Sequence, residues 1–263
     1  MKILNYNIWI KIDNSEKVGD FVNEINPDIV CFQEVLRNFD ESVFEKFKSK
    51  KIIENIIKNK FKYSFFGAVW LTDKMLMNNE IYLDFNGFVE QWNQIISKFP
   101  ITKASNEFFY WNYELKYDWT DFVKNDHSRA ILVSYLDINW KKLKIINIHG
   151  TYSKDKLDSE RSILQCEKIM QIAKRDNLPT IILWDFNLFP ETKSIKMIEK
   201  DFRNLIKEYN IKSTRPDFKD HLDEWNNVVD YIFVDDKIKV NNFEVINTNI
   251  SDHLPLILDF EIV

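Results

Sequence analysis

The chain has 263 residues, of which 45% are hydrophobic and 15% aromatic, so it can bury a sizeable core and is not expected to be disordered. Its four glycines lie too far apart for a Walker A loop, a G-x-G-x-x-G dinucleotide fingerprint or a G-x-S-x-G nucleophile elbow. The net charge of −5 argues against a globally basic nucleic-acid binder but leaves a local basic groove open.

The cysteines and the apolar runs bear on the compartment. Cys31 and Cys166 are the only cysteines and both stand in apolar stretches, which excludes a cysteine-based zinc site and a disulfide framework. Buried free thiols fit a reducing compartment. Because the sequence contains neither a signal-peptide pattern nor 18 consecutive apolar residues, we expect a cytoplasmic protein without a transmembrane segment. A mature chain whose leader had been removed would have the same features.

Hydrophobic periodicity at the start of the chain predicts a β-α-β opening. Residues 3–9 are expected to form a strand, and apolar side chains at i, i+3, i+4 and i+7 predict a helix over 18–25 that ends at Pro27. The apolar run 28–32 has the pattern of a strand buried on both faces. A second helix is expected over 41–58.

The rest of the chain is predicted to be rich in strands. The expected strands cover 63–66, 94–96, 130–138, 143–148, 180–183, 228–234 and 254–262. The expected helices cover 156–175 and 194–209. The aromatic stretch 82–122 is the least regular and is expected to consist of loops with short strands. Hairpin and crossover connections together favour an α/β fold in one domain, residues 1–263, with two mixed sheets packed together.

Polar side chains interrupt or follow the apolar runs, at positions where an unpaired buried charge would be costly. These positions are Asn7, Glu34, His149, Asp185, Asn187, Asp230, Asp252 and His253. Taken singly, each residue is more often a hydrogen-bonded structural group than a ligand. If the segments meet at one sheet edge, however, they form an oxygen-rich site that suits Mg²⁺ or Mn²⁺ better than Zn²⁺. The ordered series therefore indicates hard-metal phosphate chemistry.

Six short motifs carry a family resemblance. They are LNYNI at 4–8, DIVCFQEV at 28–35, NIH at 147–149, DFN at 185–187, VDYIFV at 229–234 and SDHLP at 251–255. In this order they resemble the endonuclease/exonuclease/phosphatase superfamily, and the resemblance spans nearly the whole chain. It implies a DNase I-like α/β fold, a four-layer sandwich of two packed mixed β-sheets flanked by helices.

The resemblance also implies a metal site. Glu34 would be the main metal ligand, and Asn7 and Asp252 would complete or flank the site. The expected ion is Mg²⁺, with Mn²⁺ as an alternative, and either one or two ions could be bound.

The remaining motif residues would carry the chemistry. Asp185 would position and deprotonate the attacking water, while Asn187 and His149 would donate hydrogen bonds to phosphoryl oxygens. His253 would face the phosphate, oriented by Asp230. The resemblance leaves open whether Asp185 or His253 is the base.

Two residues depart from the family pattern. Trp184 precedes the Asp-x-Asn motif where the family usually has glycine, and an indole would strain a backbone that needs a positive φ. We expect Trp184 to fill core space opposite Asp185; the alternatives are a bulky wall that narrows the site and an impaired enzyme. Gly150, followed by Thr151, stands where many relatives have an apolar residue.

The implied activity is a divalent-metal-dependent phosphodiesterase that uses in-line attack by water, with a nucleic acid or nucleotide as the favoured substrate. A sphingomyelinase-like or other small-molecule phosphodiesterase is the alternative, followed by a catalytically weakened domain that binds a phosphorylated ligand. Residues 188–194 are less like apurinic endonucleases than like deadenylases and sphingomyelinase-like enzymes, which disfavours abasic-site repair. The oligomeric state stays open.

Surface features could refine the substrate. Trp111 and Trp119 could stack on bases, meet a lipid interface or simply pack. The lysines within 46–62 could follow a phosphate backbone or form a solvated helix face. Arg129 and Arg215 are isolated candidates for a phosphate contact, with structural pairing as the alternative.

Overall fold

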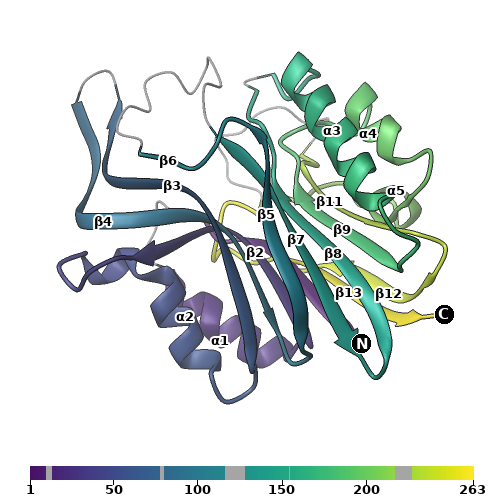
Figure 1. Cartoon of the computed structure of the whole chain (residues 1–263), viewed down its shortest axis with the longest axis horizontal. Coiled ribbons are helices and arrows are strands. Elements are labelled where there is room, and N and C mark those ends of the chain that lie inside the picture. Colours follow the sequence, from purple (N-terminus) through teal and green to yellow (C-terminus); the bar gives the residue numbers. More distant parts are fainter. Residues whose placement is uncertain (10–13, 78–79, 116–127, 154, 217–226) are drawn as a thin grey trace.

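Two mixed β-sheets pack face to face, and helices cover the outer face of each sheet (Figure 1). The structure is a computed structural model, and it describes residues 1–9, 14–77, 80–115, 128–153, 155–216 and 227–263. The helix-sheet-sheet-helix layering confirms the four-layer α/β fold expected from the sequence.

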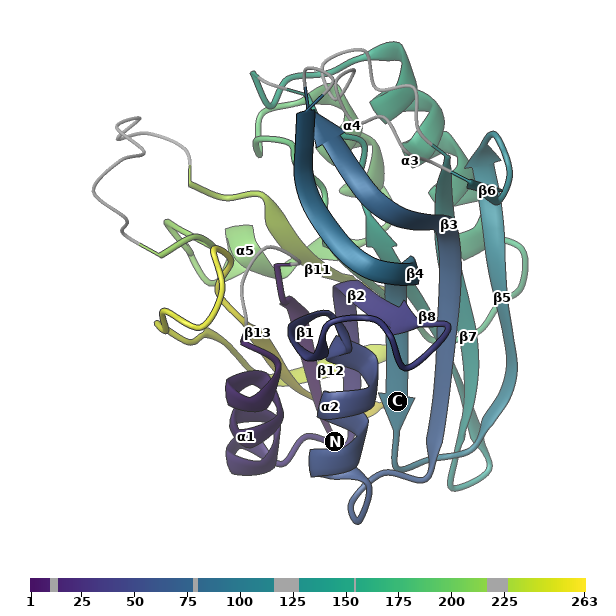
Figure 2. The same cartoon turned by 90° about the vertical axis from the view of Figure 1, so that its left-hand side faces the viewer.

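The first sheet has seven strands in the order β12-β13-β1-β2-β4-β3-β6. Their bounds are Ile238–Val245, Leu256–Ile262, Lys2–Asn7, Ile29–Asn38, Glu80–Ser97, Tyr63–Met77 and Glu114–Leu115, in that order. Strands β1 and β2 run parallel, with α1 (Ser15–Ile25) between them in the chain, so the predicted β-α-β opening is confirmed. Helices α1 and α2 (Ser49–Ile57) cover the outer face of this sheet (Figure 2).

The second sheet has six strands in the order β10-β11-β9-β8-β7-β5. Their bounds are Arg203–Asn204, Asp230–Val234, Thr180–Asp185, Lys141–His149, Arg129–Ile138 and Ile101–Tyr110, in that order. Strands β7 and β8 form the predicted hairpin, and β8 and β9 run parallel. Helices α3 (Glu160–Ala173), α4 (Lys193–Ile198) and α5 (Leu205–Glu208) lie on the outer side of this sheet (Figure 1).

Alternation along β1 decides which of its side chains enter the space between the sheets. Leu4 and Tyr6 belong to the apolar cluster under α1 and α2. Their neighbours Asn5 and Asn7 point the opposite way, because successive side chains of a strand face opposite sides of the sheet. Asn7 therefore reaches Asp185 on the second sheet.

Buried side-chain amides join the two sheets beneath the site. Gln33 Nε2 donates to Asn5 Oδ1 at 2.8 Å and to Asn147 Oδ1 at 2.7 Å. Asn147 Nδ2 in turn donates to the carbonyl oxygens of Phe32 and Gln94, both at 3.1 Å. Because buried amides are stabilising only when their partners are in place, this network fixes how β1, β2, β4 and β8 lie against one another.

The prediction of loops with short strands over 82–122 is wrong for most of that stretch, because the strands there are long. Strands β3 and β4 pair along their whole length, from Tyr63 opposite Ser97 to Met77 opposite Glu80, and β5 follows at once. Three register shifts interrupt the β3–β4 pairing, and these irregularities hide the period-two pattern that identifies a strand. Trp119 lies outside the described residues.

Two predicted helices are shorter or divided. Residues 41–58 form a 3-10 turn, η1 (Glu45–Phe47), followed by α2. Residues 194–209 form α4, the short strand β10 and α5, because Asn204 accepts a hydrogen bond from Lys207 N and so starts a new helix. The helix expected over 156–175 is α3, which begins only after the Ser159 cap. Strand β12, which carries a register shift between Val240 and Asn242, was not predicted.

Trp184 lies in the core, as expected. It is fully buried on the face of β9 opposite Asp185, and its ring stacks on that of Phe186. Its backbone pairs regularly with Ile148 and Tyr231 and has no positive φ, so the strain that a glycine position would impose is not present. A Cβ at Gly150 would lie 2.9 Å from Trp184 Nε1, so the two departures from the family pattern are neighbours in space.

Replacing Trp184 by Gly is expected to lower the free energy of unfolding by ~3–5 kcal/mol, because it empties a fully buried volume. Urea unfolding measures this, with Trp140→Gly as the matched control. Trp140 is 96% exposed and has a φ of 72°, which glycine adopts more easily, so Trp140→Gly should leave the free energy of unfolding unchanged or raise it by up to ~1 kcal/mol. A loss below about 1 kcal/mol for Trp184→Gly, or a large gain of activity, would contradict the core role.

Candidate active site

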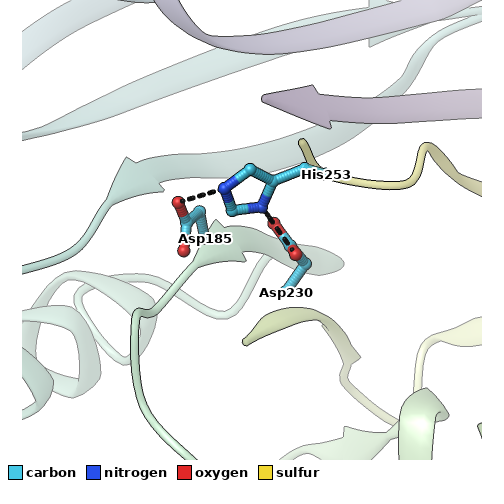
Figure 3. Close-up of side chains that lie close together, drawn as sticks. All are labelled: Asp185, Asp230 and His253. Atoms are coloured by element: carbon cyan, nitrogen blue, oxygen red, sulfur yellow. Dashed lines mark hydrogen bonds and ion pairs between the residues drawn. The ribbon is translucent and has the colours of Figure 1, made fainter. Parts of the chain in front are cut away.

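The predicted site residues meet at one end of the space between the two sheets. Asp185 ends β9 and lies opposite His149 on β8 and opposite Asp230 on β11, so these three side chains share one face of the second sheet. Asn7 at the end of β1 reaches them from the first sheet. His253, in the segment before β13, lies between Asp185 and Asp230 (Figure 3).

Glu34 lies where β2 departs from regular pairing. The register between β2 and β4 shifts between Phe32 and Val35, and Glu34 has a φ of 59°, which is unusual for a residue other than glycine. Glu34 Oε1 accepts a hydrogen bond from Asn7 Nδ2 at 3.3 Å. The bulge thus turns a carboxylate of the first sheet toward the site.

Asp185 is the buried acidic centre of the site. Its Oδ2 accepts a hydrogen bond from Asn7 Nδ2 at 3.0 Å, and its Oδ1 accepts one from the backbone N–H of Asn187, also at 3.0 Å. Burial opposes ionisation, but His253, His149 and nearby cations outweigh it and lower the pKa of Asp185 to about 2. Asp185 is therefore ionised at neutral pH.

His149 is a neutral imidazole at neutral pH. Its Nε2 lies 3.5 Å from Asp185 Oδ2 and 3.7 Å from Glu34 Oε1. Its ring lies against that of Trp92, with 5.0 Å between centroids. Burial, aided by Arg129 and other cations, lowers the pKa of His149 to about 3 in spite of Asp185. His149 can therefore donate one hydrogen bond without adding positive charge.

His253 and Asp230 form a buried dyad. His253 Nδ1 lies 2.9 and 3.0 Å from the two carboxylate oxygens of Asp230, and its Nε2 lies 3.6 Å from Asp185 Oδ2 (Figure 3). Burial opposes the charged imidazolium, but Asp230 and Asp185 outweigh it and raise the pKa of His253 to about 9. Asp230 therefore fixes a proton on Nδ1 and favours a second proton on Nε2.

Arg215 and Asp252 close the side of the site next to His253. Arg215 Nη2 lies 2.9 Å from His253 Nε2, and Arg215 Nη1 donates to Asp252 Oδ2 at 3.4 Å. Asp252 Oδ1 lies 3.9 Å from His253 Nε2. A guanidinium can only donate, so at 2.9 Å Arg215 donates to Nε2 of a neutral ring, although the charge of Asp230 favours a protonated one. A protonated Nε2–H and Arg215 would be two donors that face each other, and an anionic oxygen that separated them would accept from both.

Asn187 lies beside a lysine that the sequence analysis did not single out. Asn187 has a φ of 54°, and its Oδ1 accepts a hydrogen bond from Lys156 Nζ at 2.6 Å. Burial lowers the pKa of Lys156 to about 8, although Asp185 acts in the opposite direction. Lys156 Nζ also lies 4.2 Å from the centroid of the Tyr152 ring.

The site offers oxygen donors that suit a divalent cation. Glu34 is only partly buried, and Asn7 turns its Nδ2 toward Glu34 while its Oδ1 accepts from Trp9 N at 3.0 Å. These hard oxygen donors match Mg²⁺ or Mn²⁺. Asp185, Asp230 and His253 also have ligand atoms within 4.8 Å of one another, but His253 Nδ1 there already serves Asp230.

All eight residues predicted for the site are described, and hydrogen bonds or ion-pair distances link them into one cluster. Asp252 joins it through His253 and Arg215. Three contributors were missed: Trp92 behind His149, Lys156 on Asn187, and Gln33 in the amide network. Of these, only Gln33 had a sequence signal, since it directly precedes Glu34 in an apolar strand.

Three of the seven lysines within 46–62 are paired with glutamates. Lys48 is buried and pairs with Glu41 and Glu45, and Lys50 pairs with Glu54. Lys51 also pairs with Glu41. Because glutamates neutralise these lysines, this part of the tract is better described as a paired helix face than as a backbone-tracking groove.

Arg129 and Trp111 have different surroundings. Arg129 is buried, its guanidinium lies 4.8 Å from the Trp92 ring centroid, and burial lowers its pKa to about 10. Trp111 is 53% exposed and stacks on Tyr110. Trp111 is therefore accessible to a ligand, whereas Arg129 lies behind His149 and Trp92.

The two site histidines predict a stability maximum near pH 6.5 in metal-free buffer. Below pH 6.5 the unfolded chain protonates the equivalent of His149 while the folded chain does not, so stability falls toward pH 3. Between pH 6.5 and 9 the folded chain holds the additional proton on His253, so stability falls as the pH rises. Each limb has a slope of up to ~1.4 kcal/mol per pH unit.

Urea unfolding at pH 5, 6.5 and 8.5 with chelator tests this dependence. His149→Gln should flatten the acid limb and His253→Gln the alkaline limb. The assignment fails if His149→Gln loses as much stability as the wild type between pH 6.5 and 5.

In the described residues no helix combines the length and apolar character needed to cross a membrane.

Comparisons with known proteins give a family match and a curated relative. The Endonuclease/Exonuclease/phosphatase family matches residues 4–253. A DNA-(apurinic or apyrimidinic site) endonuclease of Plasmodium berghei is 25% identical over 279 residues, which cover 94% of this chain and 50% of that protein. The chain thus spans about half the length of this curated relative.

Solved structures share the fold at low sequence identity. An endonuclease/exonuclease/phosphatase from Bacteroides vulgatus superimposes with a TM-score of 0.71 and 16% identity, covering 100% of this chain and 98% of that one. A mannosyl-6-phosphatase from Bacteroides thetaiotaomicron superimposes with a TM-score of 0.66 and 14% identity, covering 99% of both chains. Both establish a shared fold and leave the substrate open.

Proposed function

The chain belongs to the endonuclease/exonuclease/phosphatase family, and from this premise we propose that it is a divalent-metal-dependent phosphodiesterase acting on a nucleic acid or nucleotide. One observation carries the proposal. The buried, ionised carboxylate of Asp185 lies within 3.6 Å of imidazole nitrogens of His149 and His253 and shares Asn7 with Glu34. An ionised acceptor surrounded by donors is suited to binding water beside a phosphoryl group.

Asp185 is the group that orients the attacking water and accepts its proton. It is ionised at neutral pH, whereas the Nε2 lone pair of His253 either carries a proton or accepts from Arg215. This difference favours Asp185 over His253 as the base.

The donors lie around this acceptor. His253 Nε2–H donates to a phosphoryl oxygen, with Asp230 holding the other ring nitrogen. His149 donates as a neutral imidazole, and Asn187 donates through Nδ2, because its Oδ1 already accepts from Lys156. Together they stabilise the negative charge that builds on the phosphoryl oxygens.

The metal would be held by Glu34 and by Asn7, whose amide would turn its Oδ1 toward Glu34, with Asp252, beside His253, flanking the site. A bound Mg²⁺ or Mn²⁺ neutralises developing charge on the transferring group. Its binding would also release Glu34 from its hydrogen bond with Asn7.

Two observations bear on the substrate. The curated relative is named as a DNA endonuclease that acts at abasic sites, which supports a nucleic-acid substrate. Abasic DNA, which residues 188–194 disfavoured, therefore belongs among the substrates to be tested. Trp111, exposed and stacked on Tyr110, offers a ring face to a base. A phospholipid phosphodiester remains the competing substrate, since the same ring suits a lipid interface.

A substrate panel tests the proposal. It contains single-stranded and duplex DNA, an abasic duplex, RNA, sphingomyelin, bis-p-nitrophenyl phosphate and the monoester p-nitrophenyl phosphate, each with Mg²⁺, Mn²⁺ or chelator. We expect metal-dependent cleavage of a nucleic acid or of the diester. Cleavage that survives the chelator, or cleavage of the monoester alone, would overturn the proposal. Cleavage of sphingomyelin alone would transfer it to the phospholipid class.

A further inference from the structure

Lys156 belongs to a loop that is tied to the acid-bearing segment of the site. The backbone carbonyl of Lys156 accepts a hydrogen bond from Phe189 N at 3.0 Å, two residues beyond Asn187. Ser153 Oγ donates to Leu157 O at 3.2 Å and stabilises the turn from within. Lys156 itself has a φ of 58°, which is unfavourable for a lysine and places its side chain over Asn187.

The ammonium group decides the orientation of the Asn187 amide. A lysine can only donate, so the 2.6 Å contact with Asn187 assigns the near atom as Oδ1 and leaves Nδ2 as the donating end. Without this contact the two ends of the amide would be nearly equivalent in size and could exchange. The Tyr152 ring, 4.2 Å from Nζ, supports the ammonium from its other side.

We propose that Lys156 is a positioning residue, which holds Asn187 with its Nδ2 toward the phosphoryl group of the substrate. This inference rests on the phosphodiester chemistry proposed for the site and adds a residue to it. Lys156 acts through Asn187, so the effects of removing either side chain should overlap instead of adding.

A double-mutant cycle of Lys156→Met and Asn187→Ala tests the coupling. With bis-p-nitrophenyl phosphate, Lys156→Met should lower kcat by ~10- to 100-fold, the range of a charge-assisted hydrogen bond. In the Asn187→Ala background the same change should lower kcat less than about threefold. Lys156→Arg should recover part of the loss, because it keeps a donor cation. Lys196→Met, at an exposed helix position, is the matched control and should change nothing.

A second readout does not depend on turnover. In a ¹⁵N–¹H spectrum the side-chain amide of Asn187 is identified by its loss in Asn187→Ala, and Lys156→Met should shift it while Lys196→Met should not. Inorganic phosphate, titrated into the protein, should bind more weakly to Lys156→Met than to the wild type. It should bind no more weakly to the double variant than to Asn187→Ala. Thermal unfolding checks that each variant is folded.

The outcomes separate the two proposals. If no substrate of the panel is hydrolysed but the Asn187 amide and phosphate binding respond to Lys156→Met, the proposed function fails and the positioning role stands. The positioning role is overturned if the losses of kcat are additive, or if the side-chain amide signal of Asn187 does not shift in folded Lys156→Met.

Discussion

Replacing Asp185 by Asn is expected to lower kcat by ~10³- to 10⁴-fold while the protein stays folded. The change removes the only ionised oxygen that lies within 3.6 Å of both site histidines in the described residues. Shape is preserved, because an Asn oxygen can still accept from the backbone N–H of Asn187. The new amide meets Asn7 Nδ2 donor to donor, so the free energy of unfolding should fall by no more than ~2 kcal/mol.

The measurement is kcat on the best substrate of the panel at saturating metal, together with urea unfolding. Asp236→Asn is the matched control, because Asp236 is an exposed carboxylate close to β11. Asp185 loses its role as base if the variant keeps more than a tenth of the wild-type kcat. A variant that no longer unfolds cooperatively would instead show that the buried carboxylate is needed for folding.

The sequence predicted the polar residues at the strand ends because burial of a strand decides where a charge can lie. A continuous apolar run such as 181–184 must be buried, and a charge placed directly after it must lie at the sheet edge. Parallel pairing of β8 with β9 then brings His149 opposite Asp185. Local pattern and long-range pairing agree here, which is why the motifs predicted both the fold and the convergence of these side chains.

Other features of the site depend on contacts that no local pattern records. Gln33 and Asn147 meet across 114 residues of chain, and the sequence does not distinguish these buried amides from solvated ones. Lys156 reaches Asn187 only because its loop adopts a positive φ and binds the segment after β9. Loop conformation of this kind is set by tertiary contacts, so the lysine looked like an ordinary helix-end residue.

Asp230→Asn is expected to lower the pKa of His253 by more than one unit and to lower kcat by ~10²- to 10³-fold. Asp230 is the largest of the neighbouring charges that favour the protonated ring, and its two oxygens hold Nδ1 at 2.9 and 3.0 Å. Without that charge, burial and Arg215 both favour the neutral imidazole. The ring then accepts from Arg215 at Nε2 and no longer donates to phosphate.

Proton NMR titration of the histidine C2–H signals measures the pKa directly. The chain has four histidines, and His253→Gln identifies the signal of His253. Asp235→Asn is the control, since Asp235 follows the opposite end of β11 and accepts from backbone N–H groups of Thr180 and Lys237. A His253 pKa that stays near 9 in Asp230→Asn would show that Asp185 and Asp252 suffice to hold the proton. A loss of kcat at that unchanged pKa would mean that Asp230 acts by fixing the direction of the ring, because the charge on the imidazole would then be the same in both proteins.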